Sequence, residues 1–481
     1  MILEMKHCAM NKPTLKTIPI SLLAIFAAAP LTPTLAQENV LDLTAPANYS
    51  QPSVPDYITK DNTPPDNPIT NLGATLGRVL FYDRRLSRND TISCSSCHRQ
   101  QNAFGDPATA SVGVAGTTGR HSMRLVNARF SNEERFFWDE RATSAEDQAS
   151  KPIQDHVEMG FSGTLGDPDF ADLVDKLSAI EEYQVLFQGV FGDSEVTEER
   201  VQRTLAQFIR SIQSFDSKYD VGLAQAPNDA APFANFTPQE NAGKQLFRTP
   251  PPQGGAGCAT CHQPPEFDIA PNSGNNGVSL SLGGGTDFTN TRAPTLRDLV
   301  AADGSPHSGF MHNAALPDLL AVVNHYNAIP AVVPGLDRRL LTPGPGGQAQ
   351  RLNLTQAEKD DLIAFLRTLT GSNLYTDTKW ADPFDKNGTL SFVVLPSDGM
   401  KLSLSSGDSG ESGRNATISI TGVPNVEYLI QSSIDMENWT SLQVTASALG
   451  EVTATLAAPT DTPRCFYRVS YVPDGSAPPA D

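Results

Sequence analysis

Two cysteine pairs, each followed directly by a histidine, are the residues whose types and spacing are best suited to chemistry. Two thiols three residues apart can bond to the two vinyl groups at one edge of a porphyrin, and the adjoining imidazole can ligate its iron. A lone pair of this spacing is more often a redox or zinc site, but here both copies carry the histidine and together use four of the six cysteines. The spacing therefore predicts two covalently bound haem c groups, attached through Cys94, Cys97, Cys258 and Cys261 and ligated by His98 and His262.

Segments of helical periodicity surround both motifs and must position them. An amphipathic pattern runs from Leu72 to Leu86 before the first motif, and Thr237 and Glu240 form a capping box before the second. Between the motifs, Thr197 is the expected N-cap of a helix with a single apolar face. That face consists of Val201, Leu205, Phe208, Ile209 and Ile212. The repeated order of helix and motif predicts a mainly α fold with two cytochrome c-type haem domains in tandem, related by internal duplication.

The periodicity changes from helical to alternating after the second motif. Thr355 and Glu358 form a further capping box, and Gly371 is a natural terminator of that helix. Seven short alternating runs then predict a small all-β sandwich, to which we assign no chemistry. The runs span residues 389–395, 400–406, 416–421, 427–432, 440–445, 452–457 and 465–472. We therefore expect five segments, which are a signal peptide (1–36), an extended lead-in (37–71), two haem domains (72–230 and 231–384) and the sandwich (385–481).

Composition and charge narrow the class of protein. The formal net charge is -19, which argues against nucleic acid as a partner, because phosphate binding needs a basic surface. Near the amino terminus, Lys12 and Lys16 precede an apolar run from Ile18 to Ala29, and a small-residue cleavage site ends at Ala36. No later stretch reaches the length of a membrane-spanning helix. These features predict a secreted or periplasmic protein without a membrane span.

A longer set of motifs, in the same order around both haem sites, resembles the bacterial dihaem cytochrome c peroxidase family, which includes the MauG-like enzymes. The resemblance covers residues 72–371 and does not extend to the expected sandwich. The matching stretches are residues 76–87, 137–139, 146–149, 152–153, 158–160, 293–297, 310–312 and 324–327. It implies that peroxide binds at the N-terminal haem, which is high-spin, and that the low-spin C-terminal haem stores and relays electrons.

The resemblance also implies roles for individual residues. Glu158 matches the acid/base carboxylate that moves a proton between the two peroxide oxygens, and Gln148 matches a distal-pocket amide. Trp138 matches the tryptophan that lies between the two haems and helps electrons cross. The sixth ligand of the second haem is expected to be Tyr326, as in the MauG-like subset, with Met311 as the competing candidate.

Several positions depart from the family pattern. The loop of residues 113–120 lacks the distal histidine of members that need reductive activation, which suggests a first haem that is already open when oxidised. His121 replaces the usual Asn and could itself ligate iron if the loop rearranges. The same replacement removes an Asn that the family uses for a calcium site between the haems. His156 lies two residues before Glu158, where it could tune the pocket, but the expected interpretation is a solvated loop histidine.

The function that follows is the reduction of hydrogen peroxide with electrons from a small c-type cytochrome or a cupredoxin. Donor docking on the acidic surface would be weak and salt-sensitive. Two alternatives stay open, namely a MauG-like oxidase that modifies a protein substrate and a non-enzymatic dihaem electron carrier. Dimers are common in the family, so a homodimer is a further option.

Overall fold

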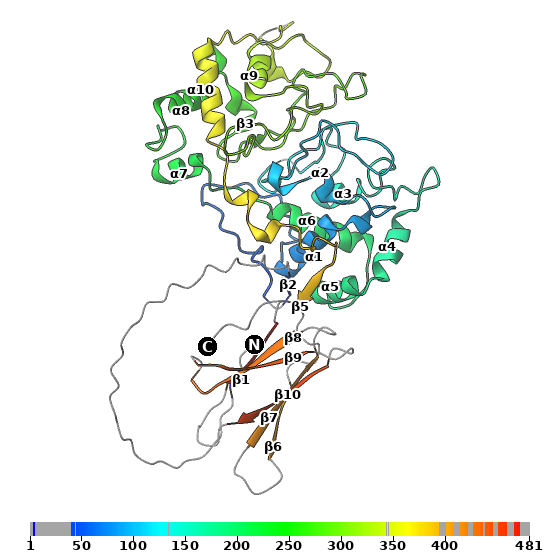
Figure 1. Cartoon of the computed structure of the whole chain (residues 1–481). Helices are drawn as coiled ribbons and strands as arrows, with labels where there is room; N and C mark the ends of the chain where they lie inside the picture. Colours follow the sequence, from blue (N-terminus) through cyan, green and yellow to red (C-terminus); the bar gives the residue numbers. More distant parts are fainter. Residues whose placement is uncertain are drawn as a thin grey trace, which may run out of the picture. The chain divides into compact units, whose positions relative to one another are not determined.

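The computed structural model divides the chain into two compact units, residues 47–383 and residues 1–46 together with 384–481 (Figure 1). It describes residues 3–4, 40–43, 45–132, 134–342, 344, 346–393, 401–406, 414–421, 427–435, 438–445, 451–458 and 466–471. The expected lead-in is shared between the units, since β2 (Val40–Asp42) belongs to one and residues 47–71 to the other. Each unit is therefore described by itself.

The larger unit is built almost entirely from helices and long loops. Its helices are α1 (Asn71–Tyr82), α2 (Cys94–Cys97), α3 (Ala145–Ser150), α4 (Phe170–Ser178), α5 (Glu181–Phe191), α6 (Glu198–Ser211), α7 (Lys218–Gln225), α8 (Pro238–Arg248), α9 (Leu319–Asn327) and α10 (Gln356–Arg367). The two-residue strands β3 (His262–Gln263) and β4 (Asp268–Ile269) pair with each other beside the second Cys-x-x-Cys-His motif. The expectation of a mainly α fold is confirmed for this part of the chain.

In the first half of this unit, α1 crosses α6 at a glycine. A side chain at Gly77 would collide with the backbone carbonyl of Thr204 and would approach the Cβ of Phe208 to 2.9 Å. Because glycine lets the two backbones meet, Phe81, one turn after Gly77, packs on Phe208 with ring centroids 5.1 Å apart. Phe104, which follows the first motif, completes this aromatic cluster.

The second half repeats this arrangement with different residues. A side chain at Gly243 on α8 would collide with the carbonyl of Asp361 on α10 and approach the Cβ of Phe365 to 2.9 Å. Phe247, one turn later, packs on Phe365 at 5.2 Å between ring centroids, and Phe267 completes the cluster. The helix pairs α1–α6 and α8–α10 (Figure 1) therefore meet through equivalent glycine and phenylalanine contacts, and the internal duplication stays a prediction.

The helix starts agree with the sequence signals. Thr197, Thr237 and Thr355 are N-caps, and the capping boxes with Glu240 and Glu358 are formed. The first helix ends earlier than expected, at Tyr82 instead of Leu86. Asp83 takes an extended backbone conformation and its carboxylate accepts a hydrogen bond from the backbone of Arg85, so the chain continues as a separate 3-10 turn, Arg84–Leu86.

The smaller unit contains the seven strands that the alternating runs predict. They are β5 (Ser391–Val393), β6 (Lys401–Ser406), β7 (Arg414–Thr421), β8 (Glu427–Ser433), β9 (Thr440–Thr445), β10 (Glu451–Ala458) and β11 (Phe466–Tyr471). One sheet has the order β1-β11-β8-β9, where β1 is Leu3–Glu4, and a second has the order β10-β7-β6. Both sheets contribute buried residues to one apolar cluster. The strand β5 instead pairs in parallel with β2.

Two localisation features were expected from the sequence. The apolar run Ile18–Ala29 and the cleavage site at Ala36 lie outside the described residues. Within the part of the chain that the structure describes, none of the helices has the length and hydropathy needed to cross a membrane.

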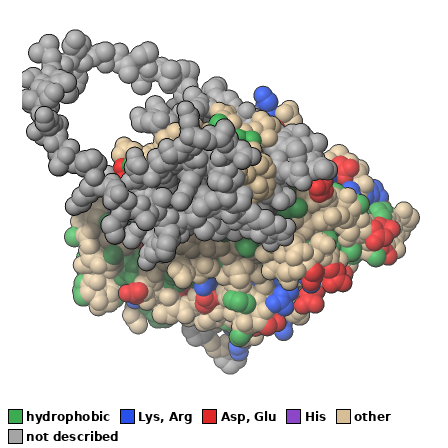
Figure 2. Space-filling model, turned by 90° about the horizontal axis from the view of Figure 1, so that it is seen from below, with side chains coloured by type: hydrophobic (Ala, Val, Ile, Leu, Met, Phe, Trp, Pro, Cys, Tyr) green, Lys and Arg blue, Asp and Glu red, His purple; other side chains and the backbone are tan. Residues whose placement is uncertain are grey.

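On the face shown in Figure 2, acidic and basic side chains of described residues lie interspersed.

Candidate functional site

The first Cys-x-x-Cys-His motif lies in the wall of a cavity of about 780 Å³. Cys94 and Cys97 begin and end the single turn of α2, which Ser93 and Ser96 cap. His98 follows, and its Nδ1 donates a hydrogen bond to the backbone oxygen of Phe104 at 3.0 Å. An iron-ligating histidine usually holds its second nitrogen in this way, which leaves Nε2 for the metal. The cavity, the paired thiols and the oriented imidazole all fit a covalently attached haem.

The second motif lies in a smaller and more apolar cavity. Cys258 and His262 line this cavity, and Cys258–Thr260 forms a 3-10 turn. His262 is half-buried, with its Nδ1 shielded from water. Burial lowers the pKa of His262 to about 4, so the imidazole is neutral at pH 7, which is the form that binds metal. The donor set of this cavity therefore also fits a haem.

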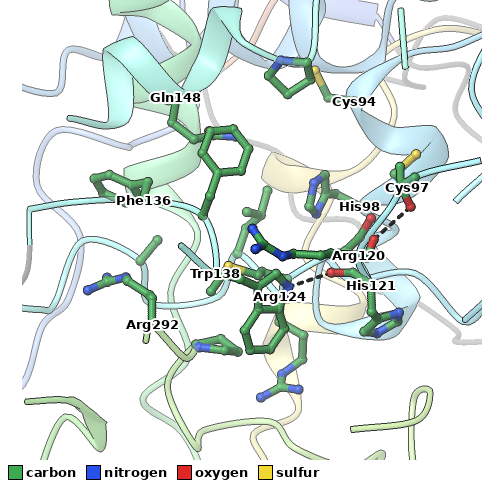
Figure 3. A pocket seen from close by; sticks show the side chains of 18 of the residues that line it. Cys94, Cys97, His98, Arg120, His121, Arg124, Phe136, Trp138, Gln148 and Arg292 are labelled. Atoms are coloured by element: carbon green, nitrogen blue, oxygen red, sulfur yellow. Dashed lines mark hydrogen bonds between the residues drawn. The ribbon is translucent and has the colours of Figure 1, made fainter. Parts of the chain in front are cut away.

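The three residues expected to act in peroxide chemistry, Glu158, Gln148 and Trp138, all line the first cavity. They come from the turn that precedes Gly160, from α3 and from the loop before α3, and Figure 3 shows Gln148 and Trp138 with the haem motif. Burial raises the pKa of Glu158 to about 7, and the charge of Asp155 adds to this effect. A carboxyl group with this pKa can both accept and donate a proton near neutral pH.

Trp138 lies in the wall of both cavities. Its indole N–H donates to the backbone oxygen of His121 at 2.7 Å, and its ring centroid lies 6.3 Å from that of His312. Trp138 therefore belongs to the wall between the two cavities, and its role as an electron relay stays a prediction.

Both candidates for the sixth ligand of the second haem line the second cavity. Tyr326 comes from α9, and Met311 from a loop position with a φ of 75°. The Asn276 amide donates to the Sδ of Met311 at 3.0 Å. The structure thus brings both side chains to one cavity, and the choice of Tyr326 stays a prediction.

Two histidines that the sequence singled out have defined partners. The Nδ1 of His121 donates to the backbone oxygen of Thr109 at 3.2 Å, and its Nε2 accepts from Ser308 at 2.9 Å. His156 was expected to be a solvated loop residue, but its Nδ1 lies 2.7 Å from the buried carboxylate of Asp167. The imidazole keeps 34% of its side-chain exposure, so it is partly solvated as expected, but the loop folds back over residues 162–167 and supplies this partner, which sequence spacing does not reveal. Among the described residues, no group of three or more His, Cys, Asp and Glu side chains could hold a metal ion.

The helix that carries Gln148 is anchored to α6 by an ion pair. Arg210 on α6 donates to Glu146 on α3 with 3.0 Å between Nη2 and Oε2. Burial raises the pKa of Glu146, but the Arg210 guanidinium outweighs this effect and holds the pKa at about 2. The pair therefore stays ionised at neutral pH and fixes α3 against the cavity.

Sequence reasoning missed several charged residues of the first cavity. Arg120, Arg124 and Arg292 lie around Trp138 in Figure 3, and Arg141 and Asp155 line the same cavity. Asp155 also positions Glu158, because its Oδ1 accepts hydrogen bonds from the backbone nitrogens of Val157 and Glu158 at 2.8 and 3.0 Å. The available signal for Asp155 was an acidic residue three positions before the candidate carboxylate. Single arginines in loops carry no comparable signal.

Comparisons with known proteins show which proteins this chain resembles. The family model described as di-haem cytochrome c peroxidase matches residues 71–228. The methylamine utilization protein MauG of Methylophilus methylotrophus is 30% identical over 325 residues, covering 65% of this chain and 86% of that protein. The cytochrome c551 peroxidase of Nitrosomonas europaea is 31% identical over 193 residues, covering 40% of this chain and 52% of that protein. A solved MauG-like protein associated with microbial copper homeostasis has 28% identity and a TM-score of 0.55, covering 69% of this chain and 98% of that one.

Proposed function

Because this chain belongs to the di-haem cytochrome c peroxidase family, which includes the MauG proteins, we propose that it reduces hydrogen peroxide to water. The family and the enzyme class expected from the sequence are thereby confirmed. In the proposed reaction, one peroxide molecule takes up two protons and two electrons, and its O–O bond breaks to give two water molecules. The electrons come from a small c-type cytochrome or a cupredoxin.

The two Cys-x-x-Cys-His motifs would hold the haem groups, with His98 and His262 as iron ligands. Each haem, when bound, would supply a redox-active iron. Haem c is attached outside the cytoplasm in bacteria. The proposed function therefore implies a periplasmic or secreted location.

The observation that carries the proposal is the half-buried Glu158 carboxyl in the wall of the first cavity, whose partial removal from water raises its pKa to about 7. Heterolytic cleavage of peroxide requires a group that takes the proton from one oxygen and returns it to the departing oxygen. Glu158 performs this transfer, and Gln148 orients the peroxide by hydrogen bonding. Trp138 carries electrons from the second haem towards the first.

Peroxide-dependent oxidation of a reduced small c-type cytochrome tests this function. We expect steady turnover for the native protein and a loss of about 10²- to 10⁴-fold in Glu158→Gln, which cannot accept the proton. The matched control is Glu199→Gln on the exposed face of α6, where the charge pairs with Arg203 and faces solvent. Full activity in Glu158→Gln with both haems attached would contradict the proposal.

A second candidate is a MauG-like oxidase that modifies another protein, favoured by the presence of Tyr326 in the second cavity. A phenolate ligand stabilises oxidised iron, whereas a thioether such as that of Met311 favours the reduced state. Steady turnover with reduced cytochrome would support the peroxidase over this candidate. Low-temperature EPR of the ferric protein separates both from an electron carrier, because a carrier has two low-spin haems and no reaction with one equivalent of peroxide.

A further inference from the structure

Arg124 is a half-buried cation in the wall that the two cavities share. Its Nη2 donates to the backbone oxygen of Thr295 at 3.0 Å, while its Nε is buried without an acceptor among the described residues. No ion pair in the described part of the chain includes Arg124. The carboxylate whose charge acts on it is that of Asp298, which instead accepts hydrogen bonds from Gly371 and Tyr375.

A guanidinium in this environment requires a counter-charge. Burial lowers the pKa of Arg124 to about 10, so the group still carries its charge at neutral pH. Leaving a charge unpaired where water is largely excluded is strongly unfavourable, and such charges in proteins are therefore paired with a counter-ion or held by several hydrogen bonds. One backbone carbonyl satisfies only part of the Arg124 guanidinium, which has five N–H donors.

Arg124 also differs from the other residues that line the second cavity in its charge. Apart from histidine, it is the one charged side chain among the residues that line this cavity, whose wall is otherwise mainly apolar. The first cavity has other cations, including Arg120, Arg141 and Arg292. Arg120 already pairs with Asp139 and Asp287. A haem carries two carboxylates on the edge opposite its vinyl groups, and Arg124 is the single arginine among the residues that line the second cavity.

We propose that Arg124 binds a carboxylate of the haem held at Cys258, Cys261 and His262. This inference rests on the haem assignment of the proposed function. The contact joins a loop of the first haem domain to the cofactor of the second. A positive charge beside a haem favours the reduced iron, which carries one positive charge fewer than the oxidised iron, so Arg124 raises the reduction potential of the second haem.

Redox titration of the full-length, two-haem protein with optical and EPR detection tests the proposal. In Arg124→Gln we expect the ratio of reduced to oxidised second haem, at a fixed applied potential, to fall at least tenfold. This corresponds to a reduction potential lower by about 59 mV for one electron. Arg124→Lys, which keeps the charge, should retain most of the native potential. The matched control is Arg129→Gln on the same segment, since Arg129 pairs with Asp61 and lines neither cavity.

The outcomes separate the possible failures. The assignment would be overturned if Arg124→Gln left the potential of the second haem unchanged or shifted only that of the first haem. It would also be overturned if Arg124→Lys lowered the potential of the second haem as far as Arg124→Gln does. Mass spectrometry establishes that each variant carries two haems. If Arg124→Gln does not carry two haems, Arg124→Met is measured instead, because methionine keeps a long side chain without charge. A native protein without haem at Cys258 and Cys261 would instead contradict the proposed function.

Discussion

The indole nitrogen of Trp138 donates a hydrogen bond to the backbone oxygen of His121, and both residues line both cavities. Aromatic rings lower the barrier to electron transfer when they fill the space between two redox centres. The hydrogen bond holds the Trp138 ring in this wall.

Trp138→Phe should therefore slow the transfer of electrons between the haems by at least about tenfold without loss of either haem. Stopped-flow spectroscopy of the second haem after peroxide addition measures this rate. Trp380→Phe is the control, because Trp380 is also buried, its N–H also donates a hydrogen bond, to Ser211, and it lines neither cavity. Equal rates in both variants would assign Trp138 a packing role only.

The pH dependence of peroxide turnover should follow the ionisation of Glu158. The reaction begins with an ionised carboxylate, so kcat/KM should rise with pH through about 7, the pKa that burial and Asp155 set. Asp155→Asn should move this limb to lower pH, because it removes a negative charge while its amide oxygen can still accept the two backbone hydrogen bonds.

Removing the positive charge of Arg141 should shift the kcat/KM profile in the opposite direction. The Arg141 charge lowers the pKa of Glu158, so Arg141→Gln should move the same limb to higher pH. The kcat/KM profile of each variant over pH 5–9 provides the measurement. Shifts of the same direction in both variants would mean that a group other than Glu158 controls the profile.

The two glycine crossings should be equally intolerant of a side chain. Gly77→Ala and Gly243→Ala place a Cβ against the backbone of the partner helix, so each should lower the free energy of unfolding by at least about 2 kcal/mol. Gly189→Ala, inside α5 with open space around it, should instead stabilise by up to about 1 kcal/mol. Chemical denaturation measures all three, and a neutral Gly77→Ala would contradict the close helix contact.

Deletion of residues after Asp385 should leave peroxide turnover intact. All residues that line the two cavities belong to the unit of residues 47–383, which has its own apolar core. The assay is peroxide-dependent oxidation of reduced cytochrome, with circular dichroism to establish folding. A folded truncation that binds two haems and no longer turns over would assign the C-terminal strands a part in the reaction.

The haem motifs, the helix caps and the seven strands could be predicted from the sequence because each depends on residues within a few positions of one another. A Cys-x-x-Cys-His motif reaches one porphyrin regardless of the rest of the chain, and a capping box closes over four residues. The resemblance to a family then located Glu158, Gln148 and Trp138, which spacing alone could not select from other polar and aromatic residues.

The tertiary structure decided what depends on distant neighbours. The pKa of Glu158 is raised because the folded chain removes its carboxyl from water, and a sequence contains no measure of that burial. Arg124 matters because the segment of residues 121–124 lies between two cavities formed by elements more than a hundred residues apart. His156 and Asp167 meet because their loop folds back on itself. Charge and desolvation act through space, so these assignments required the fold.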